Sequence, residues 1–170
     1  MSPTTSDLEL KISLETDPHL NFRPWLDELA SLASAQCADY SARGALHLAC
    51  TDELWASLPE HSQAVPARPT YPRPPPLDPA AGPSQRLIYE DAKEAHAAHT
   101  VAAAKLRKAA IASIGKANEL LIANPTHGML LHTAQTVIEN LHPIYGTYTE
   151  DAISSLELQL TTKLSTIDNF

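Results

Sequence analysis

Hydrophobic and polar residues alternate near the start of the chain. Leucine or isoleucine stands at positions 8, 10, 12 and 14, with charged or hydroxyl side chains between them. A period of two is typical of a half-buried strand. A single strand needs a partner, and residues 45–50 (ALHLAC) form the other short run that could pair with it. The alternative is an N-terminal arm without a partner strand.

The period then changes to that of a helix. Pro24 suits a helix N-terminus, and we expect this helix to end near Gly44, with Tyr40 on its apolar face. That face holds Trp25, Leu29, Leu32 and either Gln36 or Cys37. Thr51 is the expected N-cap of a second, short helix, which ends at Pro59 and carries Leu54, Trp55 and Leu58.

Prolines dominate the stretch from Pro59 to Pro83, nine of 25 residues. Because proline fixes φ and lacks a backbone donor, we expect neither helix nor sheet here. The stretch is predicted to be a connector that runs over the surface or separates two halves. Residues 71–77 (YPRPPPL), with Tyr71, Pro74, Pro75 and Pro76, have the composition of a ligand for an SH3 or WW domain. A plain spacer is the alternative.

The longest helical pattern follows the connector. Ser84 is its expected N-cap, and Gly115 predicts a break, because glycine is unfavourable in a helix interior. One face repeats at steps of four and three and consists mainly of small side chains: Ile88, Ala92, Ala95, His99, Ala102, Leu106, Ala109 and Ser113. Such a stripe lets another helix approach closely. A short segment, 116–123, leads to Pro125.

Two glycines frame the next helix. We expect Gly128 and Gly146 to take a positive φ where the helical pattern stops. Between them Thr133 is the expected N-cap of a helix whose apolar face contains Ala134, Val137, Ile138 and Leu141. Thr149 is the expected N-cap of a last helix that runs from about Glu150 towards Ile167. We expect four residues to face this helix: Val137, Ile138, Leu141 and Tyr145.

This region resembles the capsid region of Gag polyproteins from copia-type retrotransposons. The residues that carry the resemblance are Asn124-Pro125, His127-Gly128-Met129, Thr-Ala-Gln-x-Val-Ile-x-x-Leu at 133–141 and Tyr145-Gly146-Thr147-x-Thr149-x-Asp151-Ala152-Ile153. The family has a D-P-x-x-G turn, a T-x-x-Q-I-x-x-x-L helix and a Y-G-T-x-T-x-x-D-I turn. Upstream, Leu20-Asn21-Phe22-x-x-Trp25-x-x-x-Leu29 is similar to its L-x-x-N-Y-x-x-W-x-x-x-L opening.

The resemblance implies a structural protein that assembles into a particle around the element's RNA, with the RNA-binding part outside this sequence. The chain departs from the family's pattern at the long proline-rich insert and at Pro143, which we expect to interrupt the helix before Tyr145. A complete Gag would also continue beyond Phe170.

Charge and composition argue against several classes of function. The formal net charge is -8, the pI is near 5.4, and Lys and Arg together number 12, so we expect no direct contact with nucleic acid. No long apolar run or leader-like start predicts membrane insertion or secretion. We therefore expect a cytoplasmic chain, or one inside a virus-like particle. Cys37 and Cys50 are interpreted as free thiols.

Candidate chemistry is sparse. His96 and His99 lie three apart on the long helix, and Cys37, His47 and Cys50 are a second group of possible metal ligands, but both sets lack further ligands at suitable spacing. No nucleophile elbow, phosphate loop or metalloprotease pair occurs. We predict no catalytic site, no metal and no cofactor.

The predicted fold is mainly α, with a helical bundle in the C-terminal half. We divide the chain into an arm or strand with helices (1–58), a proline-rich connector (59–83) and a Gag-like helical segment (84–170), which we expect to fold without the connector. The expected function is self-association, or contact with other structural subunits. The interaction candidates are Trp25, Trp55, Tyr71, Pro74, Pro75, Pro76, Ala95, Ala102, Ala109 and Tyr145.

Two alternatives remain open. One is a virion or phage accessory subunit that docks on a larger shell or tail through an extended arm. The other is a host helical adaptor that presents its polyproline segment to a partner.

Overall fold

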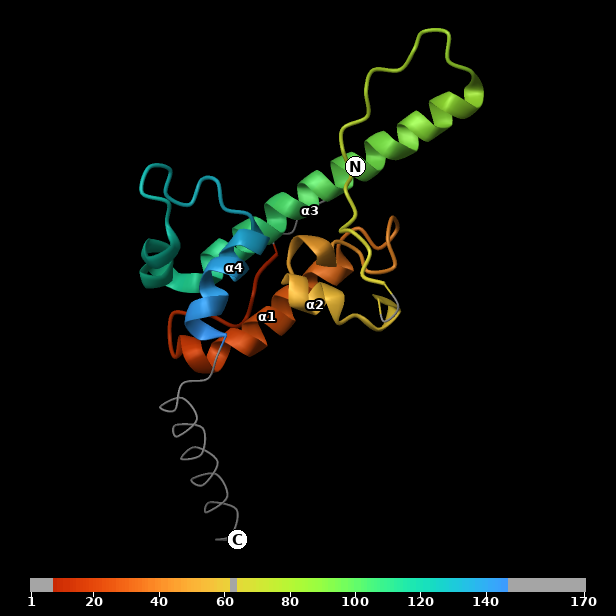
Figure 1. Cartoon of the computed structure of the whole chain (residues 1–170). Coiled ribbons are helices and arrows are strands. Elements are labelled where there is room, and N and C mark those ends of the chain that lie inside the picture. The colour runs from red at the N-terminus through yellow and green to blue at the C-terminus, as the bar shows by residue number, and fades with distance from the viewer. Residues whose placement is uncertain (1–7, 62–63, 147–170) are drawn as a thin grey trace.

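Figure 1 shows the chain as a computed structural model, in which residues 8–61 and 64–146 are described. The helices are α1 (Pro18–Ala35), α2 (Asp52–Ala56), α3 (Pro83–Ile122) and α4 (Ala134–Tyr145), with short 3-10 helices η1 (Leu46–Leu48) and η2 (Pro59–His61). The described residues contain no strand, so the protein is mainly α, as the sequence predicts. None of the described helices has both the length and the apolar character needed to cross a membrane.

The N-terminal arm alternates in burial but pairs with no strand. Leu14 is buried, and the arm's other aliphatic side chains are partly buried against the core: Leu8, Leu10 and Ile12. The strand prediction is wrong because residues 45–50 form η1 and flanking turns instead. Helices bind the arm in place of a partner strand. The Glu28 carboxylate accepts from two of its N–H groups, and the Leu14 N–H donates to the Ser113 carbonyl at 2.9 Å.

Gly115 breaks α3 where the arm crosses it. Its φ of 77° and ψ of 160° are non-helical, as the sequence predicts. The break removes the usual helical partner of the Ser113 carbonyl, which is then free to accept from Leu14. A Cβ atom at position 115 would lie 3.1 Å from Glu15, so glycine also makes room for the arm.

Helix α1 begins and ends earlier than the sequence suggests. It starts at Pro18, and Pro24, the expected N-terminus, lies inside it. The missing backbone donor of Pro24 is outweighed by burial on both sides of it, at Phe22, Trp25 and Leu29. The helix ends at Ala35 because Cys37 takes a positive φ of 58° and turns the chain back. Tyr40 therefore leaves the apolar face and is 41% exposed.

The start of α3 also differs by two residues from the expected cap. Gly82 is the N-cap in place of Ser84, and Pro83 occupies the first helical position. The Gly82 N–H donates to the Gln85 side chain at 3.1 Å. A proline at the first position loses no hydrogen bond, because that N–H has no helical partner.

One hydrophobic core joins α1, α3, α4 and the arm. Trp25 is fully buried, and its indole N–H donates to the Ser113 hydroxyl at 2.8 Å. The core takes residues from both of the parts that the sequence suggests as separate, including Phe22, Leu29, Leu106, Ile114 and Leu141. Within the described residues, α1 and the arm thus contribute to the core that α3 and α4 form.

Asn118 ties three elements together inside this core. Its side-chain NH2 group donates to the Leu14 carbonyl at 3.0 Å, and its side-chain oxygen accepts from the Tyr145 hydroxyl at 2.6 Å. The arm, the second part of α3 and the end of α4 are thus held by a single amide. Tyr145, predicted as an interaction residue, is partly buried and makes this contact within the chain.

Helix α4 confirms most of the sequence prediction. Thr133 caps it by accepting from the Thr136 N–H at 3.1 Å, and the expected apolar face is buried: Ala134, Val137, Ile138 and Leu141. The helix continues through Pro143 to its end at Tyr145, so the expected interruption there is wrong. Packing of Tyr145 against the core supports this last turn.

The two glycines that frame α4 behave differently. Gly128 has φ 54°, as expected, in a turn closed by two hydrogen bonds with Asn124. Gly146 has φ -73°, so its predicted positive φ is wrong. Its need for glycine is steric, because a Cβ atom would lie 2.4 Å from the His142 carbonyl. The helix predicted from about Glu150 towards Ile167 lies outside the described residues.

Candidate functional site

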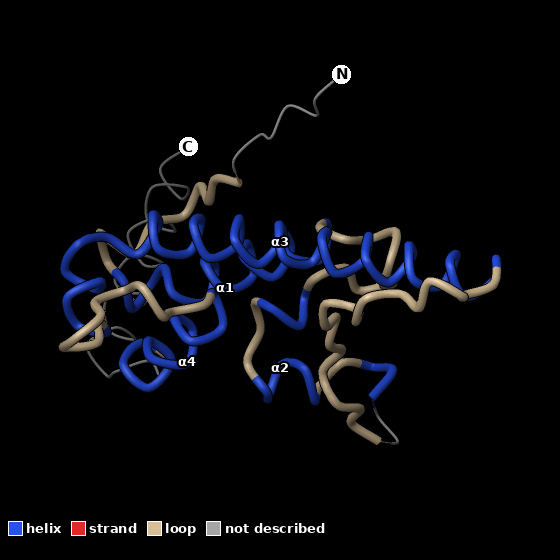
Figure 2. The backbone as a smooth tube through the Cα atoms, turned by 90° about the horizontal axis from the view of Figure 1, so that it is seen from above, coloured by secondary structure: helices blue, strands red, loops and turns tan. Residues whose placement is uncertain are grey.

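A proline-rich strap, residues 64–77, lies along the first half of α3 and runs in the opposite direction (Figure 2). Arg68 fixes the start of the strap. Its guanidinium donates to the carbonyl oxygens of His47 at 2.6 Å and Cys50 at 3.1 Å and pairs with Asp52 at 2.7 Å. The Trp55 indole N–H donates to the Pro66 carbonyl at 3.0 Å. The connector thus runs over the surface, one of the two courses expected from the sequence.

Tyr71 attaches the middle of the strap to α3. Its ring stacks on His99 with centroids 3.4 Å apart and planes at 13°. His96 Nδ1 lies 2.7 Å from the Tyr71 carbonyl and must carry the proton, because a carbonyl oxygen only accepts. His99 Nδ1 donates in the same way to Ala95 at 2.8 Å. His99 Nε2 is buried and has no hydrogen-bond partner within the described residues.

His47 lies beside this stack and has a strongly shifted pKa. It is 5% exposed, and its ring centroid lies 5.5 Å from that of His99 and 5.9 Å from that of Tyr71. Burial, and then the electrostatic interactions with His99 and Arg68, lower the pKa of His47 to about 4. His47 is therefore neutral at neutral pH, which lets the strap pack tightly over it.

The histidines and cysteines that the sequence suggests as metal ligands lie partly in this region. No group of three or more His, Cys, Asp or Glu side chains in residues 8–61 and 64–146 is placed to hold a metal ion. His96 and His99 instead bind backbone carbonyls through Nδ1, and both cysteines are free thiols.

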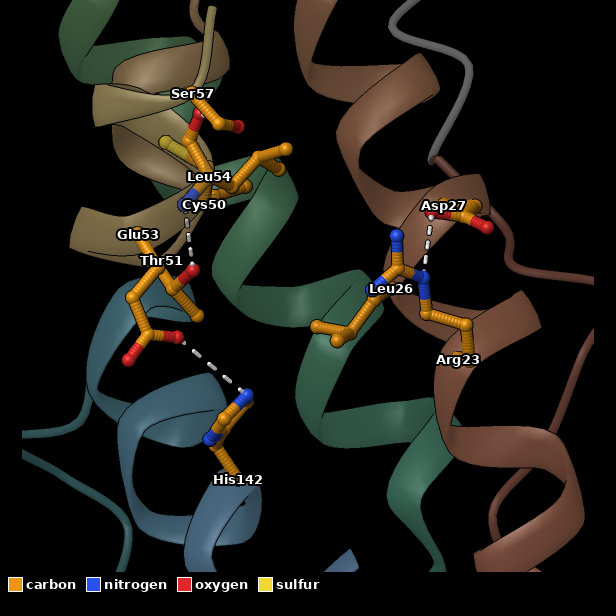
Figure 3. Close-up of a pocket in the computed structure, with 10 residues that line it drawn as sticks. Arg23, Leu26, Asp27, Cys50, Thr51, Glu53, Leu54, Ser57 and His142 are labelled. Atoms are coloured by element: carbon orange, nitrogen blue, oxygen red, sulfur yellow. Dashed lines mark hydrogen bonds and ion pairs between the residues drawn. The ribbon is translucent and has the colours of Figure 1, made fainter. Parts of the chain in front are cut away.

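A cleft of about 260 Å³ lies between α1, α2 and α4 (Figure 3). Its mouth carries the exposed pair of Arg23 and Asp27, 3.6 Å apart, and His142 with Glu53 at 3.9 Å. Cys50 lines its wall, and burial raises the pKa of this thiol, although the charge and hydrogen bond of Arg68 oppose the shift. The thiol is therefore protonated at neutral pH, so the cleft offers polar contacts without an activated Cys50 nucleophile.

Apart from Tyr145, which contacts Asn118, the residues predicted to contact a partner fall into two groups. Trp25, Ala102 and Ala109 are buried in the core, and Trp55 is buried in a smaller cluster with Leu46, Cys50 and Leu58. These side chains serve packing within the chain, and we do not propose them as partner contacts. Ala95, Tyr71 and Pro74 are partly buried where the strap approaches α3, whereas Pro75 and Pro76 are exposed.

The alanine stripe is buried over only part of its length. From His99 to Ser113 its members are buried, but Ile88 is 68% exposed, because the first half of α3 extends beyond the core (Figure 1). The stripe therefore packs against the core through its second half alone.

Three exposed aliphatic pairs were not predicted as contacts. They are 60% to 72% exposed and comprise Leu87 and Ile88, Leu120 and Leu121, and Leu130 and Leu131. Adjacent helical residues point about 100° apart, so two neighbouring leucines often do not share a narrow buried face. In the sequence, two consecutive aliphatic residues are the signal that could have predicted these exposed pairs.

Comparison of the chain with models of protein families, with curated proteins and with solved structures finds no significant match.

Proposed function

We propose that this chain is a non-enzymatic structural protein that associates with copies of itself, as the Gag capsid region that it resembles implies. The observation that carries the proposal is the set of exposed aliphatic pairs on α3 and after it: Leu87 and Ile88, Leu120 and Leu121, and Leu130 and Leu131. Scattered single leucines are ordinary on a protein surface, but doubled ones extend the apolar area at one place. Their burial between copies would supply a favourable free energy of association.

The arrangement of the residues that carry the resemblance also supports the proposal. The Phe22-x-x-Trp25 stretch forms part of α1, and Val137, Ile138 and Leu141 form the buried face of α4. These stretches lie more than 100 residues apart, yet they belong to one core, and the ring centroids of Phe22 and Tyr145 are 6.1 Å apart. A shared core is what a single capsid-like unit requires.

Charge opposes association and makes the proposal testable. Copies with a formal net charge of -8 repel, and salt screens this repulsion over a Debye length of about 8 to 10 Å at 0.10 to 0.15 M. Sedimentation velocity at neutral pH should therefore show larger species as NaCl is raised, with no further shift on adding RNA. A nucleic-acid-binding protein would instead lose its RNA complex as salt rises.

A matched pair of variants locates the contact. Leu120→Gln with Leu121→Gln should keep the chain monomeric under conditions in which the wild type associates. Thr100→Gln with Ala104→Gln changes two exposed positions on the same helix and should associate like the wild type. A wild-type chain that stays monomeric at every salt concentration would contradict the proposal and favour a subunit that docks on a larger assembly.

A further inference from the structure

The strap shows a burial pattern with a period of three. From residue 71 onward, the partly buried positions are Tyr71, Pro74 and Leu77, whereas the intervening ones are exposed: Pro72, Arg73, Pro75, Pro76, Asp78 and Pro79. A polyproline II helix has three residues per turn. The spacing therefore indicates that one edge of such a helix faces α3 and that the other two edges face solvent.

The solvent-facing edges carry a defined chemistry. Pro72 and Pro75 lie on one edge, and Arg73 and Pro76 lie on the other, while Pro79 belongs to the turn that leads into α3. The Arg73 side chain forms no hydrogen bond or ion pair with the described part of the chain. An unpaired cation three residues before an exposed proline is thus displayed by a chain whose net charge is -8.

The strap is held at both ends. The contacts of Arg68 and the stacking of Tyr71 on His99 fix its first part. At the other end the Asp78 carboxylate accepts from the Ala80 N–H at 2.9 Å, in the turn that leads into α3. Because the folded chain has already restricted the strap, a partner does not need to order it on binding.

We propose that the solvent-facing side of the strap, residues 72–76, binds an SH3-type domain of another protein. Such domains read a preformed polyproline II helix through an aromatic-lined groove. Pro72, Pro75 and Pro76 supply the apolar side chains for this groove, and Arg73 selects a domain with an acidic pocket beside it. The proposed ligand residues differ from the exposed aliphatic pairs, but Pro75 and Pro76 line one pocket together with Ile88, so a bound domain would lie beside the Leu87 and Ile88 pair.

The test measures binding of a panel of purified SH3 domains to the full chain by isothermal titration calorimetry. A domain with an acidic pocket should bind, and Arg73→Ala should weaken that binding by roughly tenfold or more, the usual effect of losing a charge-assisted contact. Arg23→Ala removes the same charge from the exposed surface of α1 and should leave the affinity unchanged. Pro76→Ala should weaken binding as Arg73→Ala does.

A synthetic peptide of residues 70–80 shows whether the folded chain leaves the binding residues of the strap accessible or covers them. The full chain should bind the same domain at least as tightly as the peptide, because its strap is already ordered. The proposal is overturned if the peptide binds and the chain does not, if no domain of the panel binds the chain, or if Arg73→Ala and Arg23→Ala bind alike.

Discussion

Replacing His47 by glutamine should reduce the loss of stability between pH 8 and pH 5 by about 2 kcal/mol. The side chain is buried beside His99 of α3 and Tyr71 of the strap, with the Arg68 guanidinium on its backbone carbonyl and Asp52 paired to that guanidinium. Glutamine keeps a polar, neutral side chain at this position but cannot take up a proton between pH 4 and pH 7.

The magnitude follows from the pKa of His47 in the two states. The pKa is 6.5 when the chain is unfolded and about 4 when it is folded. The unfolded chain therefore binds the proton first, so the stabilising contribution is complete above pH 6.5 and is lost as the pH falls towards 4. At pH 5 the loss amounts to about 2 kcal/mol, from 1.36 kcal/mol per pKa unit.

Urea denaturation followed by tryptophan fluorescence measures this loss at pH 8, 7, 6 and 5. Between pH 8 and pH 5 the free energy of unfolding of His47→Gln should fall by about 2 kcal/mol less than that of the wild type. His127→Gln is the matched control, since His127 is exposed in the turn after α3. If the free energy of unfolding of both His47→Gln and His127→Gln falls with pH as steeply as that of the wild type, burial of a neutral His47 does not contribute to the acid sensitivity of the chain.

Three further predictions concern the core. Leu141→Ala should lower the free energy of unfolding by about 2 to 5 kcal/mol, whereas exposed Glu139→Ala should change it little, and equal thermal melts for the two would contradict the burial of Leu141. Trp25→Phe should lower the free energy of unfolding by about 1 to 3 kcal/mol in urea titrations, because the buried Ser113 hydroxyl loses the indole N–H that donates to it. The double variant Trp25→Phe with Ser113→Ala should lose less stability than the sum of the two single variants. A fragment of residues 84–170 should lack a cooperative melt by circular dichroism, and a sharp transition would show that it needs nothing from α1 or the arm.

The sequence predicted those features that depend on neighbours a few residues away. The Thr133 cap, the buried face of α4 and the break at Gly115 each follow from local hydrogen bonding or backbone conformation. The alternation of residues 8–14 also predicted which side chains of the arm face the core. The alternation could not show which group the backbone of the arm binds. Its partner, the Ser113 carbonyl, is free to accept only because α3 breaks about 100 residues further along the chain.

The two failed predictions at Pro24 and Pro143 share a physical cause, since packing against distant residues decided both of them. Pro24 stays inside α1 because Phe22 and Trp25 are buried around it, and α4 continues past Pro143 while Tyr145 reaches Asn118. The stacking of Tyr71 on His99 could not be predicted from the sequence either, because a free spacer and a strap docked on a helix have the same proline-rich composition.

The Trp25 contact with Ser113 also has a consequence for the time at which the chain can fold. The two residues are separated by 88 positions, and the arm bonds to Asn118 across 104. At roughly 5 to 20 residues per second, the ribosome needs on the order of 4 to 18 seconds to synthesise the 88 residues between the two partners. During that interval α1 has no complete core to enter, so Phe22, Trp25 and Leu29 stay accessible to chaperones. Such widely separated contacts also place the chain among the slower folders of the helical class, since distant segments must meet before their burial stabilises them.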